Sequence, residues 1–259
     1  MTIRADRIVS YEPDANMVNV MRASFLVAGP LLARFAQFRC VHPGGCNLGL
    51  RPVNVDVQGF RAMGALVETE ESSYVAEAPA GLKGARIYLD YPSHTGTEDL
   101  IMAASLADGT TTIVHASREP EVLDLVRFLK SMGAQIYGAG TSIIEVVGTD
   151  KLHGSTHHII PDRLVAGTFA IAVTMCGGEL ELIDATPEDL VPVLHKLGEV
   201  GATVDYGANC VSIKSNSTLT ATEVQSMPHP GFPTDKQAEM AVLLTQAHGT
   251  STVIERAFD

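Results

Sequence analysis

Apolar residues recur at helical spacing in two long segments of the chain. In Glu121–Met132, four of them occupy positions i, i+3, i+4 and i+7 and so share one helix face: Val122, Leu125, Val126 and Leu129. Gly133 follows directly, and glycine is the common residue just beyond a helix C-terminus. Pro187–Val200 has the same design, with Pro187 at a favourable helix start. The pattern predicts two amphipathic helices.

Other segments predict inner helices and strands. Three are rich in small residues, which favours close helix packing: Glu98–Ala107, Val165–Met175 and Gln237–Ala247. Runs of β-forming residues predict strands at Phe38–Val41, Gln135–Tyr137, Ser142–Val147 and Gly249–Arg256. Val53–Met63 is a further amphipathic segment. The chain is therefore expected to mix helices and strands throughout.

These elements recur with a period of about 70 residues, longer than a typical solenoid repeat. Gly-Ala pairs follow the second helix of successive units, at Gly64, Gly133 and Gly201. Glycines mark the first turns in the same register, at Gly109, Gly178 and Gly249. By this count, we expect Met1–Val9 to be the closing strand of an incomplete unit and the last unit to stop after its strand. The repeat predicts truncation at both ends.

The 259 residues, 46% hydrophobic and 19% charged, suffice for a sizeable core in one large domain or two smaller ones. A formal net charge of −12 argues against nucleic acid or an anionic membrane as partner. An anionic small substrate would need a local group of arginines. No apolar run approaches the roughly 18 residues of a membrane span, and no signal-peptide core is present. Four cysteines without metal-type spacing predict a cytoplasmic protein with reduced thiols.

The stretch Val41–Arg51 concentrates a proline, three glycines, a cysteine and an arginine. Gly44 and Gly45 allow a positive φ, close approach to a ligand, or movement as a lid. Cys46 lies near its centre, and a nearby cation such as Arg51 favours the reactive thiolate. The residue types alone leave open a surface loop with an idle cysteine.

The pattern Pro43-Gly44-Gly45-Cys46-x-x-Gly49-x-Arg51-Pro52-Val53 resembles the catalytic loop of the UDP-N-acetylglucosamine 1-carboxyvinyltransferase family, enolpyruvyl transferases that open peptidoglycan synthesis. Further stretches resemble that family in order: Met21–Ser24 with Gly29–Leu31, Thr95–Glu98, Arg118–Glu121, Pro161–Arg163 with Ala166–Phe169, and Pro230–Gln237. The resemblance covers essentially the whole chain. It implies roles in cell-wall biogenesis, cell shape, cell division and the cell cycle. It also implies that the protein is a target of the inhibitor fosfomycin.

The resemblance also implies an α/β (α+β) fold. Family members have two domains, each an inside-out α/β barrel of three βαβαββ units, with substrates between them. Residues 1–158 would form the catalytic-loop domain without its first elements, and residues 159–259 part of the second domain. The family's early Lys-Asn pair and later arginines fall outside the chain. Asn54, Val55 and Asp56 stand where the family has Asp, then Leu-His, and Ala257 replaces a larger aliphatic residue.

The family transfers the enolpyruvyl group of phosphoenolpyruvate to the 3′-hydroxyl of UDP-N-acetylglucosamine and releases phosphate. This chemistry needs an acid, a base and cations around anionic groups. By resemblance Cys46 is the acid, and Asp235 is the base, at a helix start whose dipole favours its ionised form. The other substrate-binding positions implied are Arg22, Arg51, Pro52, Val53, Asn54, Val55, Thr95, Gly96, Glu119, Asp162, Arg163 and Ala257, with Asp235 also facing the sugar.

Several of these residues have a purely structural alternative. Asp235 could be a helix N-cap, and Arg22 and Arg163 could form ion pairs. The His153-x₃-His157-His158 spacing hints at a metal, but no acidic or cysteine cluster adjoins it in sequence, which favours a solvated turn entering a strand. The absence of redox-nucleotide and metal motifs fits a cofactor-free reaction, and the family implies a monomer whose partners are its two substrates.

Three functions stay open. The first is the enolpyruvyl transferase; the second is a non-catalytic remnant that at most binds a nucleotide sugar. The third is a sister enzyme acting on a shikimate-type substrate, against which Cys46 counts. The predicted truncation favours a chain that is inactive on its own and marginally stable, with four apolar side chains of its last inner helix exposed to water: Met240, Val242, Leu243 and Leu244.

Overall fold

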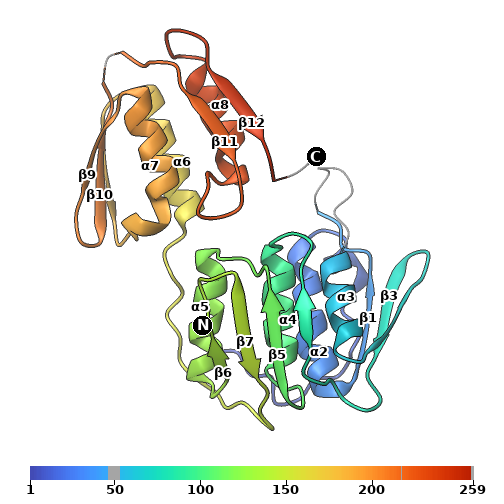
Figure 1. Ribbon diagram of the computed structural model, residues 1–259. Coiled ribbons are helices and arrows are strands. Elements are labelled where there is room, and N and C mark those ends of the chain that lie inside the picture. Colours follow the sequence, from blue (N-terminus) through green and yellow to red (C-terminus); the bar gives the residue numbers. More distant parts are fainter. Residues whose placement is uncertain (46–52, 217, 258–259) are drawn as a thin grey trace. The chain divides into compact units, whose positions relative to one another are not determined.

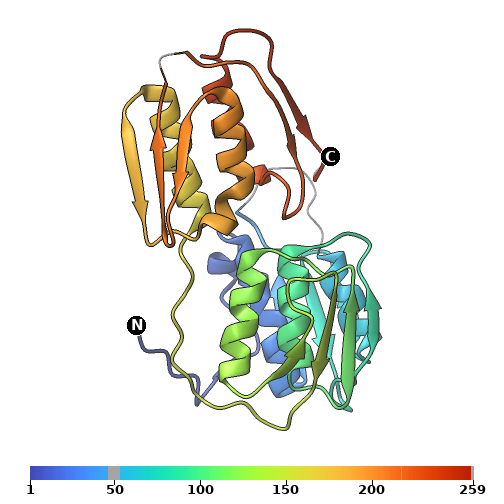
Figure 2. The same cartoon turned by 60° about the vertical axis from the view of Figure 1, so that its left-hand side comes forward.

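The computed structural model describes residues 1–45, 53–216 and 218–257, which form a mixed α/β structure. The chain divides into two compact units, Met1–His157 and His158–Asp259 (Figure 1 and Figure 2). Among the described residues, no helix is both long enough and apolar enough to cross a membrane.

The first unit begins with an antiparallel sheet in the order β1-β3-β2. Its strands are β1 (Gln37–Val41), β2 (Leu66–Thr69) and β3 (Ser73–Glu77). The helical elements are α1 (Ala15–Val18), the 3-10 helix η1 (Arg22–Val27), α2 (Ala28–Phe35) and α3 (Asn54–Ala62). Phe38 and Cys40 alternate with exposed residues along β1 and are buried, as expected of a sheet with one face on a core.

A four-stranded sheet follows in the order β4-β5-β7-β6, with β4 parallel to β5 and the other pairs antiparallel. Its elements are β4 (Arg86–Tyr88), α4 (His94–Ala104), β5 (Thr110–Val114), α5 (Pro120–Ser131), β6 (Gln135–Tyr137) and β7 (Ile143–Val147). Ile113 and Ile144 are direct cross-strand partners, and both are fully buried. They belong to one apolar core that runs through the unit.

Helix α4 is the innermost element of the first unit, where it contacts α2, α3 and α5 (Figure 1). Leu100 and Ile101 are fully buried. Two glycines on neighbouring helices permit the close approach. A Cβ built on Gly59 would lie 2.2 Å from Leu100 Cδ2, and one on Gly29 would lie 2.3 Å from the Asp99 carbonyl oxygen. The inner helix expected from the small residues of this segment is confirmed.

The second unit contains an antiparallel sheet in the order β8-β10-β9 and a parallel pair, β11 with β12. Its elements are α6 (Arg163–Cys176), β8 (Glu179–Ile183), α7 (Pro187–Val200), β9 (Thr203–Tyr206), β10 (Cys210–Lys214), β11 (Glu223–Ser226), η2 (Thr234–Lys236), α8 (Gln237–Leu244) and β12 (Thr252–Glu255). Figure 2 shows α6 and α7 beside this sheet, and they contact each other.

The two amphipathic helices are confirmed, as α5 and α7. The predicted inward face of α5 is buried at Val122, Val126 and Leu129. Gly133 has φ +103° just beyond α5, and Gly201 has φ +118° at the end of α7. Side chains are disfavoured in this left-handed conformation, which explains the glycine after each helix.

Two expectations about the chain's first and last segments are wrong. Met1–Val9 forms no strand and pairs with none of the described strands; its residues are exposed, so water can take up their backbone hydrogen bonds. On α8, Met240, Leu243 and Leu244 are buried rather than exposed, and only Val242 of the predicted four faces water, at 54%. Met240, Leu243 and Leu244 belong to the apolar core of the second unit, together with residues of α6 and α7.

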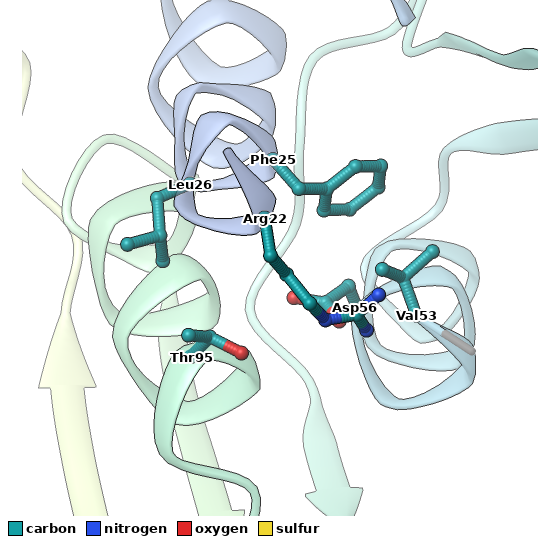
Figure 3. A pocket seen from close by; sticks show the side chains of 6 residues that line it. All are labelled: Arg22, Phe25, Leu26, Val53, Asp56 and Thr95. Carbon is teal, nitrogen blue, oxygen red and sulfur yellow. The ribbon is translucent and has the colours of Figure 1, made fainter. Parts of the chain in front are cut away.

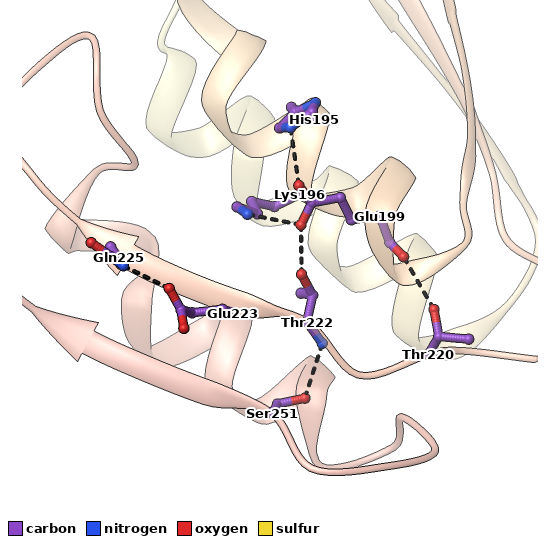
Figure 4. A network of polar contacts seen from close by, with 8 residues as sticks. All are labelled: His195, Lys196, Glu199, Thr220, Thr222, Glu223, Gln225 and Ser251. Carbon is purple, nitrogen blue, oxygen red and sulfur yellow. Dashed lines mark hydrogen bonds and ion pairs between the residues drawn. The ribbon is translucent and has the colours of Figure 1, made fainter.

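Polar contacts fix the C-terminal end of α7 to the segment before β11 (Figure 4). Glu199 Oε2 accepts hydrogen bonds from Lys196 Nζ at 2.8 Å and from Thr222 Oγ1 at 2.5 Å. Its other oxygen, Oε1, lies 3.0 Å from His195 Nε2. The hydrogen bonds from Lys196 and Thr222 lower the pKa of Glu199, so this carboxylate stays ionised and keeps both donors.

The burial of β7 makes a prediction about stability. Ile144→Ala removes a fully buried side chain and should lower the free energy of unfolding by about 2–5 kcal/mol. Ile143 is the matched control, because it is the preceding residue of the same strand and 49% exposed. Ile143→Ala should cost less than about 1 kcal/mol. Urea denaturation of both variants measures this difference, and equal losses would mean that the faces of β7 are wrongly assigned.

Candidate functional site

Three of the expected substrate-binding residues line one pocket of the first unit: Arg22, Val53 and Thr95. They come from the start of η1, the residue before α3 and the first turn of α4. The rest of the lining is Phe25, Leu26 and Asp56. In Figure 3 the Arg22 side chain reaches from η1 toward Asp56 on α3. A cation, a carboxyl group and a hydroxyl group in one pocket suit a polar or anionic ligand.

The N-terminal ends of α3 and α4 pack against each other beside this pocket. A Cβ built on Gly96 would lie 2.7 Å from Val55 Cγ1, so a larger residue at Gly96 would push the helices apart. Ser93 Oγ caps α4 by accepting the Gly96 N–H at 3.1 Å. Asn54, the first residue of α3, is exposed. Helix N-termini carry partial positive charge, so this arrangement favours anions.

Two carboxyl groups belong to this region: Asp56 on α3 lines the pocket, and Asp99 on α4 interacts electrostatically with Asp56. Both are buried. Burial raises the pKa of Asp56 to about 6, against the lowering effects of its own backbone N–H and of Arg22. Burial and the charge of Asp56 raise the pKa of Asp99 well above its usual range, against a 2.7 Å hydrogen bond from the Gly29 N–H to Asp99 Oδ1. The pair therefore holds a proton near neutral pH.

Glu119 is the N-cap residue of α5 and lies near the first turn of α4. His94 Nε2 is 3.2 Å from Glu98 Oε1. Burial alone would lower the pKa of His94, but the hydrogen bond and charge of Glu98, with the charges of Glu121 and Glu119, raise it overall. Glu119 is thus close enough to α4 for its charge to be felt there, although it does not line the pocket with Arg22.

The glycine loop packs against the segment after α1. A Cβ built on Gly44 would lie 2.0 Å from the Asn19 carbonyl oxygen. Gly45 has φ +82°, and a Cβ built on it would lie 2.5 Å from the Val20 carbonyl oxygen. The positive φ expected here is confirmed at Gly45, and the close approach is to backbone. Three expected site residues that follow lie outside the described residues: Cys46, Arg51 and Pro52.

The described cysteines differ in exposure. Cys40 is fully buried, and burial, with the charges of Asp99 and Glu12, raises the pKa of its thiol to about 11. Cys176 is exposed, and Cys210 is partly buried. Because the thiolate is the reactive form, Cys40 is inert toward electrophiles at neutral pH.

Asp162 and Arg163 begin α6 in the second unit, at a second small pocket that also includes Thr186 and Asp189. Asp162 Oδ1 accepts the backbone N–H groups of Leu164 and Val165, both at 2.9 Å. Asp162 is therefore an N-cap of α6. A cap leaves its second oxygen available, so the structural role does not conflict with ligand binding.

Asp235 lies in η2, just before α8, and is exposed. No side-chain cap is formed at the start of η2 or of α8, so the N-cap alternative is not what the structure shows for this carboxylate. The next residue, Lys236, is buried and donates to Thr168 Oγ1 at 2.6 Å and to Glu239 Oε1 at 2.7 Å. These bonds anchor η2 to α6 and α8. Ala257 follows β12, and its N–H donates to Glu255.

The histidines of the linking segment do not form a metal site. His157 Nε2 lies 3.0 Å from Asp124 Oδ1, and its ring packs on Phe128. The acidic partner was missed in the sequence because it lies on α5, and residues 151–162 form no strand. In the part of the chain that the structure describes, no group of three or more histidine, cysteine or acidic side chains could hold a metal.

The sequence pattern did not identify Asp56, Asp99 and Lys236 as parts of the candidate sites. Asp56 was noted only as a departure from the family pattern. A charged residue within an apolar helical pattern, as in Asp99 among the small residues of α4, was the available signal. Its partners lie on other elements and are set by the fold.

The sequence model of the EPSP synthase family, described as 3-phosphoshikimate 1-carboxyvinyltransferase, matches residues 1–259. The chain belongs to this family. Two relatives are named UDP-N-acetylglucosamine 1-carboxyvinyltransferase: one from Nostoc sp., 46% identical, and one from Trichormus variabilis, 45% identical. Each match runs over 261 residues and covers 99% of this chain and 58% of the relative. The resemblance read from the sequence is confirmed, and the chain spans under two thirds of these relatives.

Solved structures of two enolpyruvyl transferases share the fold of this family member. The enolpyruvyl transferase NikO from Streptomyces tendae is 24% identical, with a TM-score of 0.81, over 95% of this chain and 59% of that one. An EPSP synthase from Acinetobacter baumannii is 23% identical, with a TM-score of 0.63, over 89% of this chain and 54% of that one. They support the α/β class.

The glycine-loop motif around Cys46, together with the burial of Cys40, predicts selective labelling at Cys46. Iodoacetamide at neutral pH followed by peptide mass mapping should label Cys46 and leave Cys40 unmodified, because the Cys40 thiol is buried and protonated. Cys176 is exposed and is the internal comparison for simple accessibility. Faster modification of Cys176 or Cys210 than of Cys46 would contradict the special reactivity expected of the loop.

The buried carboxyl pair makes a prediction about pH and stability. A carboxyl whose pKa is raised on folding stabilises the fold most at low pH, and that contribution is lost as the pH rises from its unfolded pKa, near 4, through its folded pKa. Asp99→Asn keeps an oxygen for the Gly29 N–H but cannot ionise. The variant should therefore gain stability over wild type, by about 1 kcal/mol or more at pH 8 and less at pH 4.5.

Melting curves at both pH values measure this gain. Asp108→Asn is the control, because Asp108 is exposed and its pKa is lowered by its hydrogen bond from Lys83. It should give no gain that grows with pH. A constant or reversed difference for Asp99→Asn would show that Asp99 is not held protonated by the fold.

Proposed function

We propose that this chain is part of a UDP-N-acetylglucosamine 1-carboxyvinyltransferase, which transfers the enolpyruvyl group of phosphoenolpyruvate to the sugar 3′-hydroxyl and releases phosphate. The observation that carries the proposal is the identity of 45–46% along 99% of this chain to relatives with that name. The complete Pro43–Cys46 motif supports it. The reaction would place the protein in peptidoglycan synthesis, and it is an addition and elimination that needs no cofactor.

The proposed chemistry divides between the two units. In the loop, Cys46 protonates C3 of phosphoenolpyruvate, and its sulfur can add to C2, so that S–H adds across the C=C bond. In the second unit, the exposed Asp235 takes the hydroxyl proton. Arg22 and Arg51 hold anionic groups, and electrostatic stabilisation of this kind contributes strongly to catalysis. Asp162 and Arg163 serve the sugar site.

The remaining substrate positions follow from the same proposal: Pro52, Val53, Asn54, Val55, Thr95, Gly96, Glu119 and Ala257. Val53 and Thr95 are supported by their place beside Arg22 in one pocket. Residue 54 is an asparagine, so this position offers a neutral amide to a ligand in place of a carboxylate.

We further propose that residues 1–158 are the catalytic-loop domain and residues 159–259 part of the second domain, each built from βαβαββ units of an inside-out barrel. Support comes from the sheets: β4-α4-β5-α5-β6-β7 has that element order, and the orders β1-β3-β2 and β8-β10-β9 match each other. Cytoplasmic location, a monomeric state and inhibition by fosfomycin stay predictions.

A second candidate is transfer to a shikimate phosphate, because the matching family is described as 3-phosphoshikimate 1-carboxyvinyltransferase. The cysteine in the loop counts against it. Direct comparison of the two acceptors by calorimetry separates the candidates: UDP-N-acetylglucosamine should bind, and shikimate 3-phosphate should not bind measurably under the same conditions.

The proposed acid makes a covalent prediction. Incubation with phosphoenolpyruvate and UDP-N-acetylglucosamine should add the mass of one phosphoenolpyruvate to the protein, located by peptide mapping at Cys46. Cys46→Ser should abolish the adduct, whereas Cys176→Ser, which removes an exposed thiol, should leave it intact. An adduct that persists in Cys46→Ser, or binding of the shikimate acceptor alone, would refute the proposal.

A further inference from the structure

The pocket of the first unit presents a cation and a carboxyl group side by side. Arg22 and Asp56 both line it, and in Figure 3 the Arg22 side chain points toward Asp56. The interaction is electrostatic as well as geometric, because the charge of Arg22 lowers the pKa of Asp56. Asp56 is 4% exposed, so this attraction acts in a poorly solvated place and is only weakly screened.

Asp99 on α4 lies close enough to Asp56 for the Asp56 charge to raise the pKa of the Asp99 carboxyl. Its Oδ1 accepts the Gly29 N–H at 2.7 Å, while Oδ2 is buried and has no hydrogen-bond partner among the described residues. A buried, unpartnered carboxylate oxygen beside another carboxylate is strongly unfavourable. Asp99 is therefore the neutral member of the pair, and Asp56 carries the negative charge that faces Arg22.

The other charged and titratable groups near Asp56 do not supply a positive charge in place of Arg22. Asp99 approaches from α4, with Glu98 next to it, and Tyr74 approaches from β3. Burial raises the pKa of Tyr74, so it is neutral near pH 7. Of the groups with a resolved effect on Asp56, Arg22 supplies the positive charge.

We infer that Asp56 is a positioning residue for an anion site at Arg22: it holds the guanidinium at the pocket wall and takes up one proton when an anion binds there. The identity of the natural anion, a phosphate or carboxylate of the substrates, rests on the proposed function. The proton uptake does not, since it follows from the place of Asp56 beside Arg22.

The coupling has a simple physical origin. An anion bound at Arg22 partly neutralises the positive charge that stabilises the Asp56 carboxylate. It also brings a second negative charge near that carboxylate. Both effects raise the pKa of Asp56 above its unliganded value of about 6. By linkage, anion affinity must then rise as the pH falls toward and through that value, by at most about tenfold per pH unit for one proton.

Sulfate is a suitable probe, because its charge is constant between pH 5.5 and pH 8. Calorimetric titration of the full chain in two buffers of different ionisation enthalpy gives both affinity and protons bound. Wild type should bind sulfate several-fold more tightly at pH 5.5 than at pH 8, with net proton uptake near pH 7. Asp56→Asn should show no uptake from this group and an affinity that changes little with pH.

Two further variants separate positioning from charge alone. Asp56→Ala removes the polar side chain altogether and should bind sulfate more weakly than Asp56→Asn, because no polar group remains beside Arg22 to hold it in place. Asp108→Asn removes an exposed carboxylate distant in sequence from the pocket and should keep the wild-type proton uptake. A merely structural role for Asp56 would change stability in these variants without removing the proton uptake.

Several results would overturn the inference. They are wild-type binding without proton uptake, undiminished uptake in Asp56→Asn, or no sulfate binding by wild type at either pH. If the Asp56 variants do not fold, ¹³C NMR of wild-type carboxyl groups decides: one signal titrating near pH 6 must move toward its protonated position when sulfate is added. Competition by phosphoenolpyruvate tests the proposed function separately, since its failure would leave the sulfate result unchanged.

Discussion

The contact of α4 with α2 and α3 is the constraint on which the first unit depends. Gly29 and Gly59 let the helices approach so closely that a single added Cβ would meet the Asp99 carbonyl at 2.3 Å or the Leu100 side chain at 2.2 Å. At that distance the Asp99 carboxyl can accept a hydrogen bond from the Gly29 N–H. The same packing brings the start of η1 and the N-termini of α3 and α4 together, and these elements carry Arg22, Val53 and Thr95. The site is thus a consequence of helix packing.

The cost of this arrangement is two buried carboxyl groups, and its chemical effect is a proton held near the site. An apolar side chain at either position would avoid the desolvation of a carboxyl group. Asp56 instead gives Arg22 a fixed counterion, and Asp99 supplies a hydrogen-bond acceptor to the backbone of α2. In the second unit, Lys236 has a comparable part: its buried ammonium ties η2 to α6 and α8, while the adjacent Asp235 is exposed.

Local patterns predicted the elements well where one physical signal dominated. The bounds Pro187–Val200 and Gln135–Tyr137 agree with the structure, because the helix has a proline start and a glycine end and the strand is flanked by turn residues. The loop motif and its family could be recognised because the residues that define them follow one another in the sequence. The burial of α8 could not be predicted in this way, since whether Met240 is exposed depends on helices far away in sequence. Met1–Val9 has a strand-like composition but pairs with none of the described strands. The Asp56–Asp99 and Asp124–His157 pairs depend on tertiary contacts that no local pattern contains.

The central claim is that η1 and the N-terminal ends of α3 and α4 form one ligand site in this enolpyruvyl transferase family member. Hydrogen–deuterium exchange with and without UDP-N-acetylglucosamine and phosphoenolpyruvate tests it most directly. The account predicts slower exchange in peptides that contain Arg22, Val53 and Thr95, with little change in the β7 strand around Ile144. Protection confined to other segments, or none at saturating ligand, would contradict it.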